Sequence, residues 1–196
     1  ITEYHDQQQG AIHDLGLLKR EAEERAVLLA EANEKIEYVS LHDAHTGLAN
    51  RRYLERRLEE AVRKGERLAV LHVDLDRFKQ INDNYGHDVG DQVLIEISQT
   101  LSQSLTDESI ISRYGGEEFA LLVYGVDPQQ QRAFIGNLQK VIKNQLKTPD
   151  AKDVTASFGV AVWEPGTAAD SWLKRADTAL YLAKERGRDC AVFSHE

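Results

Sequence analysis

The stretch "IISRYGGEEFALLV", residues 110–123, has two apolar runs separated by the pair Gly115-Gly116. Short apolar runs flanking two glycines predict a β-hairpin with a two-residue turn. Glu117 and Glu118 follow the glycines directly, so the hairpin carries two adjacent carboxylates. Acids in a hairpin turn are usually explained as a solvated loop, and a functional role requires a further acid beside them.

A candidate for that further acid is Asp74, which ends the apolar strand "LAVLHVD" (68–74). If the hairpin lies beside this strand, its turn and Asp74 come to the same sheet edge. Three carboxylates at one place repel each other and stay ionised together only around a cation. Oxygen ligands of this kind suit Mg²⁺, which takes the rest of its shell from water and phosphates. The glycines would let a nucleotide approach the backbone.

The rest of the chain after residue 43 alternates helix and strand patterns. Apolar spacing predicts helices over 53–64, 93–105, 128–147 and 172–186, and a strand over 154–162. Gly65 and Gly187 mark two helix ends. Helices mixed with strands around one sheet predict an α/β domain with at least one antiparallel hairpin.

Residues 1–42 contain no proline and follow a heptad pattern. The frame holds Ile1, Tyr4, Gln8, Ala11, Leu15, Leu18, Ala22, Arg25, Leu29, Ala32, Ile36 and Val39. All of these slots are apolar except Gln8 and Arg25, which predicts a two-stranded coiled coil. The alternative is an amphipathic helix packed on its own domain. A helix of this length measures roughly 60 Å and would extend beyond a small domain.

The bulk composition narrows the class of protein. The net charge of −9 argues against a general nucleic-acid binder. The single cysteine, Cys190, excludes an internal disulfide and suits a reducing compartment. No apolar run is long enough to cross a membrane, so we expect a cytoplasmic segment without direct membrane contact. The chain begins at Ile1 rather than Met, as a fragment of a longer protein would.

Four motifs in order resemble the GGDEF family of diguanylate cyclases. They are "DAHTGLANRR" (43–52), "DLDRFKQINDNYGHDVGD" (74–91), "GGEEF" (115–119) and "ADTALYLAKERGR" (176–188). The resemblance implies a cyclase domain over 43–196, preceded by a coiled-coil linker over 1–42. It also implies a palm-like fold, with a central mixed sheet flanked by helices, similar to polymerase palms and class III nucleotidyl cyclases.

The activity that the resemblance implies joins two GTP molecules into cyclic di-GMP and releases two pyrophosphates. A ribose 3′-hydroxyl attacks an α-phosphorus with the help of two Mg²⁺ ions, for which Mn²⁺ can substitute. Such metal pairs lie roughly 3.5–4 Å apart. By motif match, Asp74 and Glu117 bridge the metals, while Glu118 and the Leu75 carbonyl are additional ligands. Glu118 would also polarise the 3′-hydroxyl, which makes Asp74, Glu117 and Glu118 the catalytic residues.

The same motif match assigns the substrate contacts. Asn82 and Asp91 would read guanine, because an aspartate accepts from N1–H and the 2-amino group, which adenine lacks as a pair. Helix capping is the plain alternative for both. Lys79, Lys184 and Arg188 would bind phosphates, and Phe78 would bring a backbone N–H near them. For the last two cations alone, the alternative is favourable charge at a helix C-terminus.

Several positions depart from the family pattern or adjoin it. Thr106 and Ser109 stand where many members have the Arg and Asp of an inhibitory product site, so we predict no such site. His45 and Asp189 also differ from the usual residues, and we predict that neither touches the chemistry. Asp43 and Arg51 bracket the join to the helix. A salt bridge there would pass on helix rotation, the alternative being a helix cap and a surface arginine.

Three functions compete. The first is an active cyclase that binds GTP, works as a homodimer through the coiled coil, and is driven by an upstream sensory domain. The second is a catalytically weak receptor for GTP or cyclic di-GMP, and the third is a passive dimerisation module. The complete set of metal and guanine residues favours the first.

Overall fold

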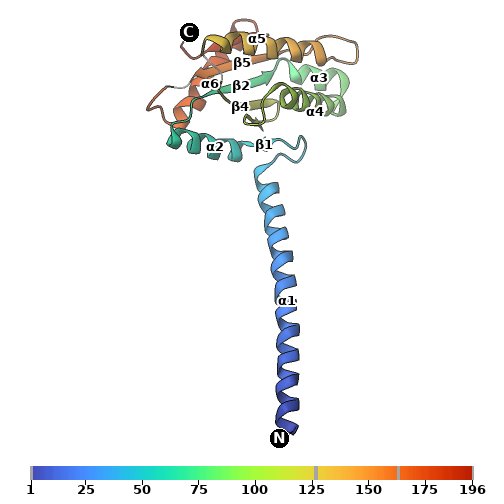
Figure 1. Ribbon diagram of the computed structural model, residues 1–196. Helices are drawn as coiled ribbons and strands as arrows, with labels where there is room; N and C mark the ends of the chain where they lie inside the picture. The colour runs from blue at the N-terminus through green and yellow to red at the C-terminus, as the bar shows by residue number, and fades with distance from the viewer. Residues whose placement is uncertain (1, 126–127, 163, 196) are drawn as a thin grey trace. The chain divides into compact units, whose positions relative to one another are not determined.

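The computed structural model describes the backbone of residues 2–125, 128–162 and 164–195, and their side chains except those of 2–14, 128 and 129. Internal contacts divide the chain into two compact units, residues 1–40 and 41–196. Helix α1 (Thr2–Leu41) supplies the whole described part of the first unit (Figure 1). Among the described residues, no helix combines the length and apolar character needed to span a membrane.

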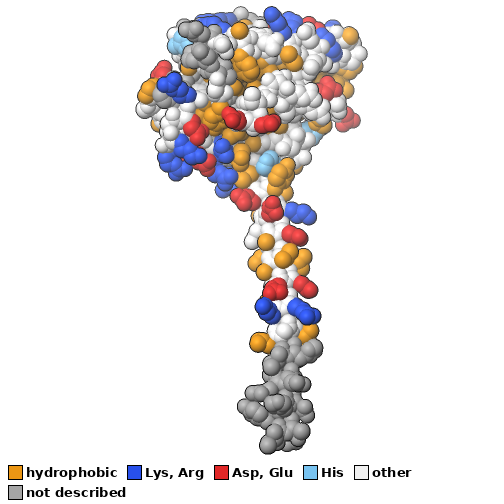
Figure 2. Space-filling view, in the orientation of Figure 1, with side chains coloured by type: hydrophobic (Ala, Val, Ile, Leu, Met, Phe, Trp, Pro, Cys, Tyr) orange, Lys and Arg blue, Asp and Glu red, His pale blue; other side chains and the backbone are white. Residues whose placement is uncertain are grey.

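The side chains of α1 are exposed from residue 15 to residue 40. Large apolar groups are among them, such as Leu15 at 69% exposure and Val39 at 71%. Figure 2 shows these apolar side chains along α1, interspersed with charged ones. The predicted helix is confirmed. The heptad slots at Ile1, Tyr4, Gln8 and Ala11 lie outside the described side chains, and the pairing of two such helices remains a prediction.

The second unit is built on a mixed sheet of six strands in the order β1-β3-β4-β2-β5-β6. The strands are β1 (Ala49–Asn50), β2 (Leu68–Leu75), β3 (Ile110–Arg113), β4 (Glu118–Tyr124), β5 (Ala156–Val162) and β6 (Ala191–Phe193). β2 runs antiparallel to both of its neighbours, β4 and β5, whereas β1 with β3 and β5 with β6 are parallel pairs. The predicted α/β class with a central mixed sheet is confirmed.

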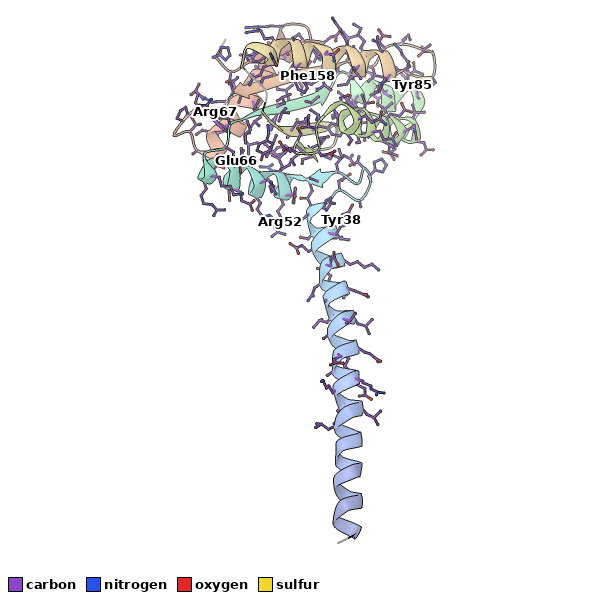
Figure 3. All side chains as sticks on the ribbon, viewed as in Figure 1. Tyr38, Arg52, Glu66, Arg67, Tyr85 and Phe158 are labelled. Atoms are coloured by element: carbon purple, nitrogen blue, oxygen red, sulfur yellow. The ribbon has the colours of Figure 1, made fainter. Side chains whose placement is uncertain are left out.

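Helices cover both faces of the sheet (Figure 1). They are α2 (Arg51–Lys64), α3 (Phe78–Tyr85), α4 (His87–Ser104), α5 (Pro128–Gln145) and α6 (Ala169–Glu185). Residues of α3, α4 and α5 form one core cluster with alternate residues of β2, and residues of α2 and α6 form the other. Phe158 of β5 lies fully buried in the first cluster (Figure 3). All eight residues of β2 are buried because this strand is covered on both faces.

Local sequence explains the ends of α2. Asn50 caps the helix by accepting a hydrogen bond from the Tyr53 N–H, at 3.1 Å. Gly65 ends it in the left-handed conformation, with φ at 68°, where an L residue would be strained. The predicted end at Gly65 is therefore confirmed, and the cap places β1 directly before the helix.

The predicted two-residue hairpin turn is wrong. β3 ends at Arg113 and β4 begins at Glu118, so four residues separate the strands. A two-residue turn of the usual hairpin types needs positive φ at one or both central positions. Gly115 and Gly116 are not among the glycines with positive φ. Instead, the N–H groups of Tyr114 and Gly115 both donate to the Glu118 carbonyl, at 2.8 and 3.1 Å.

Candidate active site

Asp74 occupies the end of the central strand, where its side chain is almost fully buried. It is 6% exposed, and its register partners on the neighbouring strands are Glu118 of β4 and Ser157 of β5. Burial raises the pKa of Asp74, and the Lys184 ammonium, 2.8 Å from its carboxylate, acts against that rise. The strand and the last turn of α6 therefore bring an acid and a cation together at this edge.

The turn that carries Glu117 is held from both sides. The Leu75 N–H donates to the Glu117 carbonyl at 3.3 Å, which fixes the turn against β2. On the other side, Arg113 Nη2 donates to the Gly116 carbonyl at 2.8 Å. Burial raises the pKa of the Glu117 carboxyl, and the neighbouring Asp74 raises it further. The two carboxylates thus interact electrostatically across the strand end.

Glu118 begins β4 and folds back over the turn. A Cβ built on Gly115 would lie only 2.7 Å from Glu118 Oε2, so a larger residue there would displace the Glu118 carboxylate. Among the described residues, no group of three or more His, Cys, Asp or Glu side chains is arranged to hold a metal ion. Asp74 and Glu118 both raise the pKa of Glu117, Asp74 more strongly, but the three carboxylates do not form a closed metal-binding set.

An open pair of carboxylates is nevertheless the donor set that Mg²⁺ uses in phosphate-handling sites. Mg²⁺ usually takes one or two carboxylates from the protein and completes its octahedral shell with waters and substrate phosphates. Burial raises the pKa of both carboxyls, and nearby acids raise it further, Asp76 for Asp74 and Asp74 for Glu117; a divalent cation would relieve this repulsion. The residues present therefore suit a magnesium–phosphate complex better than a metal bound by protein alone.

The predicted guanine-reading residues lie on consecutive helices. Asn82 is half-buried on α3, and Asp91 is exposed on α4. The helices approach closely at Gly90, where an added Cβ would lie 1.9 Å from Asn82 Oδ1 and 3.2 Å from Phe78 Cζ. Gly90 therefore fixes where the Asn82 amide can lie, a positioning role that the sequence analysis did not identify.

Replacing Gly90 with alanine should raise the KM for GTP about tenfold or more, because the new methyl group displaces the Asn82 amide. The melting temperature should change little, since the displaced atom ends a flexible side chain. Steady-state kinetics and thermal unfolding measure the two effects. An unchanged KM in a folded Gly90→Ala variant would remove Asn82 from the substrate site.

His45 lies beside Asp91, although the prediction that it does not touch the chemistry remains untested. Its Nε2 is 3.7 Å from Asp91 Oδ1 and 3.4 Å from the Asp91 carbonyl oxygen. Asp189 lies beside Asp76. Its N–H donates to Asp76 Oδ2 at 2.9 Å, and its carboxylate pairs with Lys143 at 2.6 Å. Both residues thus adjoin candidate substrate ligands.

The candidate phosphate ligands occupy two elements. Lys79 is exposed on the first turn of α3, and Phe78 before it packs its ring into the core, which leaves only its backbone available. Lys184 and Arg188 come from the end of α6 and the turn that follows. Both favour the ionised form of Asp74 electrostatically, Lys184 more strongly. These two cations therefore lie on the same side of the site as Asp74.

Asp76 is a buried structural residue that the sequence analysis missed. It is 7% exposed and accepts hydrogen bonds from Thr155 Oγ1, Ser157 Oγ and the Asp189 N–H. These bonds join the end of β2 to the start of β5 and to the turn that carries Arg188. Its place two residues after Asp74, in "DLD", was the available signal.

Of the two readings of Asp43 and Arg51, the salt bridge is absent from the described ion pairs, and the alternative of a turn-capping aspartate and a surface arginine fits the contacts. Asp43 Oδ1 instead accepts from Thr46 and from Arg113 Nη1, the latter at 3.1 Å. Burial raises the pKa of Asp43, but the Thr46 hydrogen bonds and the Arg113 guanidinium outweigh it and the net pKa is lowered. Arg51 pairs with Glu55 at 2.7 Å. Asp43 therefore contacts the β3–β4 hairpin through Arg113. The two residues lie too far apart in the sequence for residue spacing to predict this contact.

Comparison with known proteins agrees with this geometry. The family description "Diguanylate cyclase, GGDEF domain" matches residues 40–190. The chain is 37% identical over 175 residues to the bifunctional diguanylate cyclase/cyclic di-GMP phosphodiesterase MucR of Pseudomonas aeruginosa, covering 86% of this chain and 25% of MucR. It is 35% identical over 171 residues to the probable diguanylate cyclase DgcC of Escherichia coli, covering 84% of this chain and 46% of DgcC.

A solved structure shows the same architecture. The coiled coil and GGDEF domain of DgcB from Caulobacter crescentus, in complex with cyclic di-GMP, superimposes with a TM-score of 0.80 at 29% identity. The alignment covers 90% of this chain and 98% of that one. The sheet and its helices therefore define a palm-like domain. The chain belongs to the GGDEF family of diguanylate cyclases, and it spans between a quarter and a half of the two curated relatives named above.

Proposed function

We propose that this chain is the catalytic part of a diguanylate cyclase, which condenses two GTP molecules into cyclic di-GMP and two pyrophosphates. The observation that carries the proposal is the arrangement at the end of β2. Asp74 and Glu117 form an interacting carboxylate pair there, and the Lys184 ammonium lies 2.8 Å from Asp74. Enzymes of nucleotidyl transfer use carboxylates that hold a metal ion and cations that bind a phosphate, and this strand end has candidates for both.

In the proposed site, Asp74, Glu117, Glu118 and the Leu75 carbonyl would hold two Mg²⁺ ions, or Mn²⁺ as a substitute. Such ions would lower the pKa of the 3′-hydroxyl and neutralise the leaving pyrophosphate. Lys184, whose ammonium pairs with Asp74 at 2.8 Å, is placed to bind a phosphate beside these ligands.

The remaining substrate contacts orient GTP. Lys79 and Arg188 hold the β- and γ-phosphates together with the backbone N–H of Phe78. Asn82 and Asp91 select guanine, because an ATP molecule would leave the Asp91 carboxylate without its two donors. The attacking oxygen then forms a new bond to the α-phosphorus, and the bond to pyrophosphate breaks.

The direct test is incubation of the dimeric protein with GTP and Mg²⁺, followed by chromatography of the products. We expect cyclic di-GMP and pyrophosphate in a one-to-two ratio. GTP binding without turnover would instead support the receptor function, and neither binding nor turnover would support a dimerisation module.

The inhibitory product site should be missing, since Thr106 and Ser109 occupy its positions. Their hydroxyl groups lie 3.1 Å apart and bond to each other, and neither can replace a bidentate arginine at a guanine base. We therefore expect the rate at saturating GTP to fall less than twofold when micromolar cyclic di-GMP is added. Strong inhibition that GTP does not relieve would contradict this and indicate another inhibitory site.

A dimer is required in this proposal, because each site holds one GTP and the product contains two GMP units. The exposed apolar slots of α1, such as Leu18 and Leu29, each 62% exposed, would pair with those of a second copy. An upstream sensory domain would then act through this helix pair. A coiled coil can carry such a signal because two arrangements of its core differ little in energy.

Arg25 is the place to test that role, since it occupies a core slot of the heptad frame and its guanidinium lies 4.0 Å from Glu21. Arg25→Leu should strengthen pairing in this frame and change basal cyclase activity severalfold, upward if the frame is the productive one. Rates are compared at concentrations where both proteins are dimeric. Identical rates, with identical response to the upstream signal, would reduce the helix to a tether.

A further inference from the structure

A cavity of about 490 Å³ lies next to the candidate phosphate ligands. It is enclosed by the end of β2, helix α3, the start of β5 and the turn after α6. Tyr85, at the end of α3, forms part of its wall (Figure 3). Its charged lining residues are Asp76, Arg77, Lys152, Asp153, Arg188 and Asp189. The cavity therefore continues from the site at Arg188 toward residues without an assigned role.

The acidic members of this lining already have partners. Asp76 accepts three hydrogen bonds from Thr155, Ser157 and the Asp189 backbone. Asp153 pairs with Lys147, and Asp189 pairs with Lys143, each at 2.6 Å. Asp153 and Asp189 are therefore neutralised by lysines, whereas Asp76 is bonded only by uncharged donors and keeps its negative charge in the lining.

The cationic members are balanced differently. Lys152 pairs with Asp150 at 2.6 Å. Within the described part of the chain, no ion pair or side-chain hydrogen bond engages the guanidinium of Arg77 or of Arg188. The lining thus has two guanidinium charges, of Arg77 and Arg188, against the single carboxylate charge of Asp76, which leaves a net positive charge. The cavity therefore has the electrostatics of a site for a compact polyanion.

The backbone fixes these two arginines on separate elements. Arg77 and Arg188 both have positive φ, 57° and 69°, which is uncommon outside glycine. The hydrogen bond from the Asp189 N–H to Asp76 holds the turn after Arg188 against the end of β2, one residue before Arg77. The side chains are thus supplied by two segments that Asp76 ties together, rather than by one mobile loop.

We propose that this cavity binds inorganic pyrophosphate, with Arg77 as a ligand beside Arg188. The choice of pyrophosphate rests on the proposed function, which releases it at the edge formed by Lys184 and Arg188. A pyrophosphate carries more negative charge than an orthophosphate, and its two phosphorus centres can reach guanidinium groups that come from two separate segments. Arg188 would contact the terminal phosphates before cleavage and share the product with Arg77 afterwards.

The test measures binding of inorganic pyrophosphate to the full chain by calorimetry in buffer with EDTA, which excludes a metal-held complex at Asp74. Arg77→Gln should weaken pyrophosphate binding at least tenfold. Arg186→Gln is the matched control, because it removes the same charge from an exposed position two residues before Arg188 and outside the cavity lining. Binding to that variant should stay within twofold of wild type.

Further arms separate the possible outcomes. Orthophosphate should bind at least tenfold more weakly than pyrophosphate, and equal affinities would reduce the cavity to a general anion site and overturn the proposal. Absent pyrophosphate binding, or equal binding by wild type and Arg77→Gln, would overturn it also.

If pyrophosphate binding depends on Arg77 but GTP is not converted, the cavity assignment stands and the proposed cyclase reaction fails. If cyclic di-GMP forms while binding is independent of Arg77, the reaction stands and the cavity assignment fails.

Discussion

Replacing Glu117 with glutamine should lower cyclic di-GMP formation by about a thousandfold or more, because a neutral amide bridges Mg²⁺ poorly. Stability should not fall. The Glu117 carboxyl has a raised pKa through burial and the nearby Asp74, so its ionised form costs the folded state some stability at neutral pH. Removing that charge should leave the melting temperature unchanged or slightly higher.

The two readouts together distinguish a catalytic carboxylate from a structural one. Turnover is measured by product chromatography, and unfolding by thermal denaturation without metal. Glu59→Gln on the exposed side of α2 is the matched control and should retain wild-type activity. If Glu117→Gln produces cyclic di-GMP near the wild-type rate, the assignment of Glu117 as a metal ligand is wrong.

Replacing Gly159 with alanine should produce the largest loss of stability. A Cβ there would lie 2.0 Å from the Ala176 carbonyl oxygen and 2.2 Å from the Leu180 backbone nitrogen. Both atoms belong to the backbone of α6, which cannot move aside as a side chain can. We expect a cost of about 3 kcal/mol or more. In a domain of this size that lowers the melting temperature by roughly 10 °C.

The same substitution at Gly136 is the control. Gly136 lies within α5, and an added Cβ there meets no atom within 4 Å. Gly136→Ala should stabilise the protein by up to about 1 kcal/mol, because alanine loses less conformational freedom in a helix. Urea unfolding measures the free energies of both variants, and thermal unfolding measures their melting temperatures. If Gly159→Ala unfolds within 2 °C of wild type, the close packing of β5 on α6 is not as described.

Much of the fold followed from sequence because its elements are long and strongly patterned. The apolar run of β2 and the repeating apolar positions of α4 and α6 contain enough residues to show their period. β1 and β6 have two and three residues, and the eight-residue α3 lies within a motif dominated by polar groups. Such short segments are set by tertiary pairing rather than by local pattern.

In the candidate site, only residues that belong to a sequence motif could be predicted. The strand register places Asp74 beside Glu118, as the hairpin expectation requires. The hairpin turn was not predictable, because two glycines permit many conformations and the cross-strand bonds select one. Gly90, Asp76 and the pair of Asp43 with Arg113 depend on helix packing or on contacts between distant segments. Residue spacing carries no information about such contacts.

Segment 43–51 is attached to the end of β3, and this attachment limits where a chimeric protein can be joined. The segment contacts three consecutive residues, 112–114. Ala49 pairs with Ser112 as strand neighbours, and Asp43 forms an ion pair with Arg113. The Arg51 guanidinium lies 4.6 Å from the centre of the Tyr114 ring. Tyr114 is followed at once by the glycines of the turn that carries Glu117. A foreign module joined before residue 43 would leave this attachment intact, whereas a junction inside 43–51 would remove part of the support of that turn.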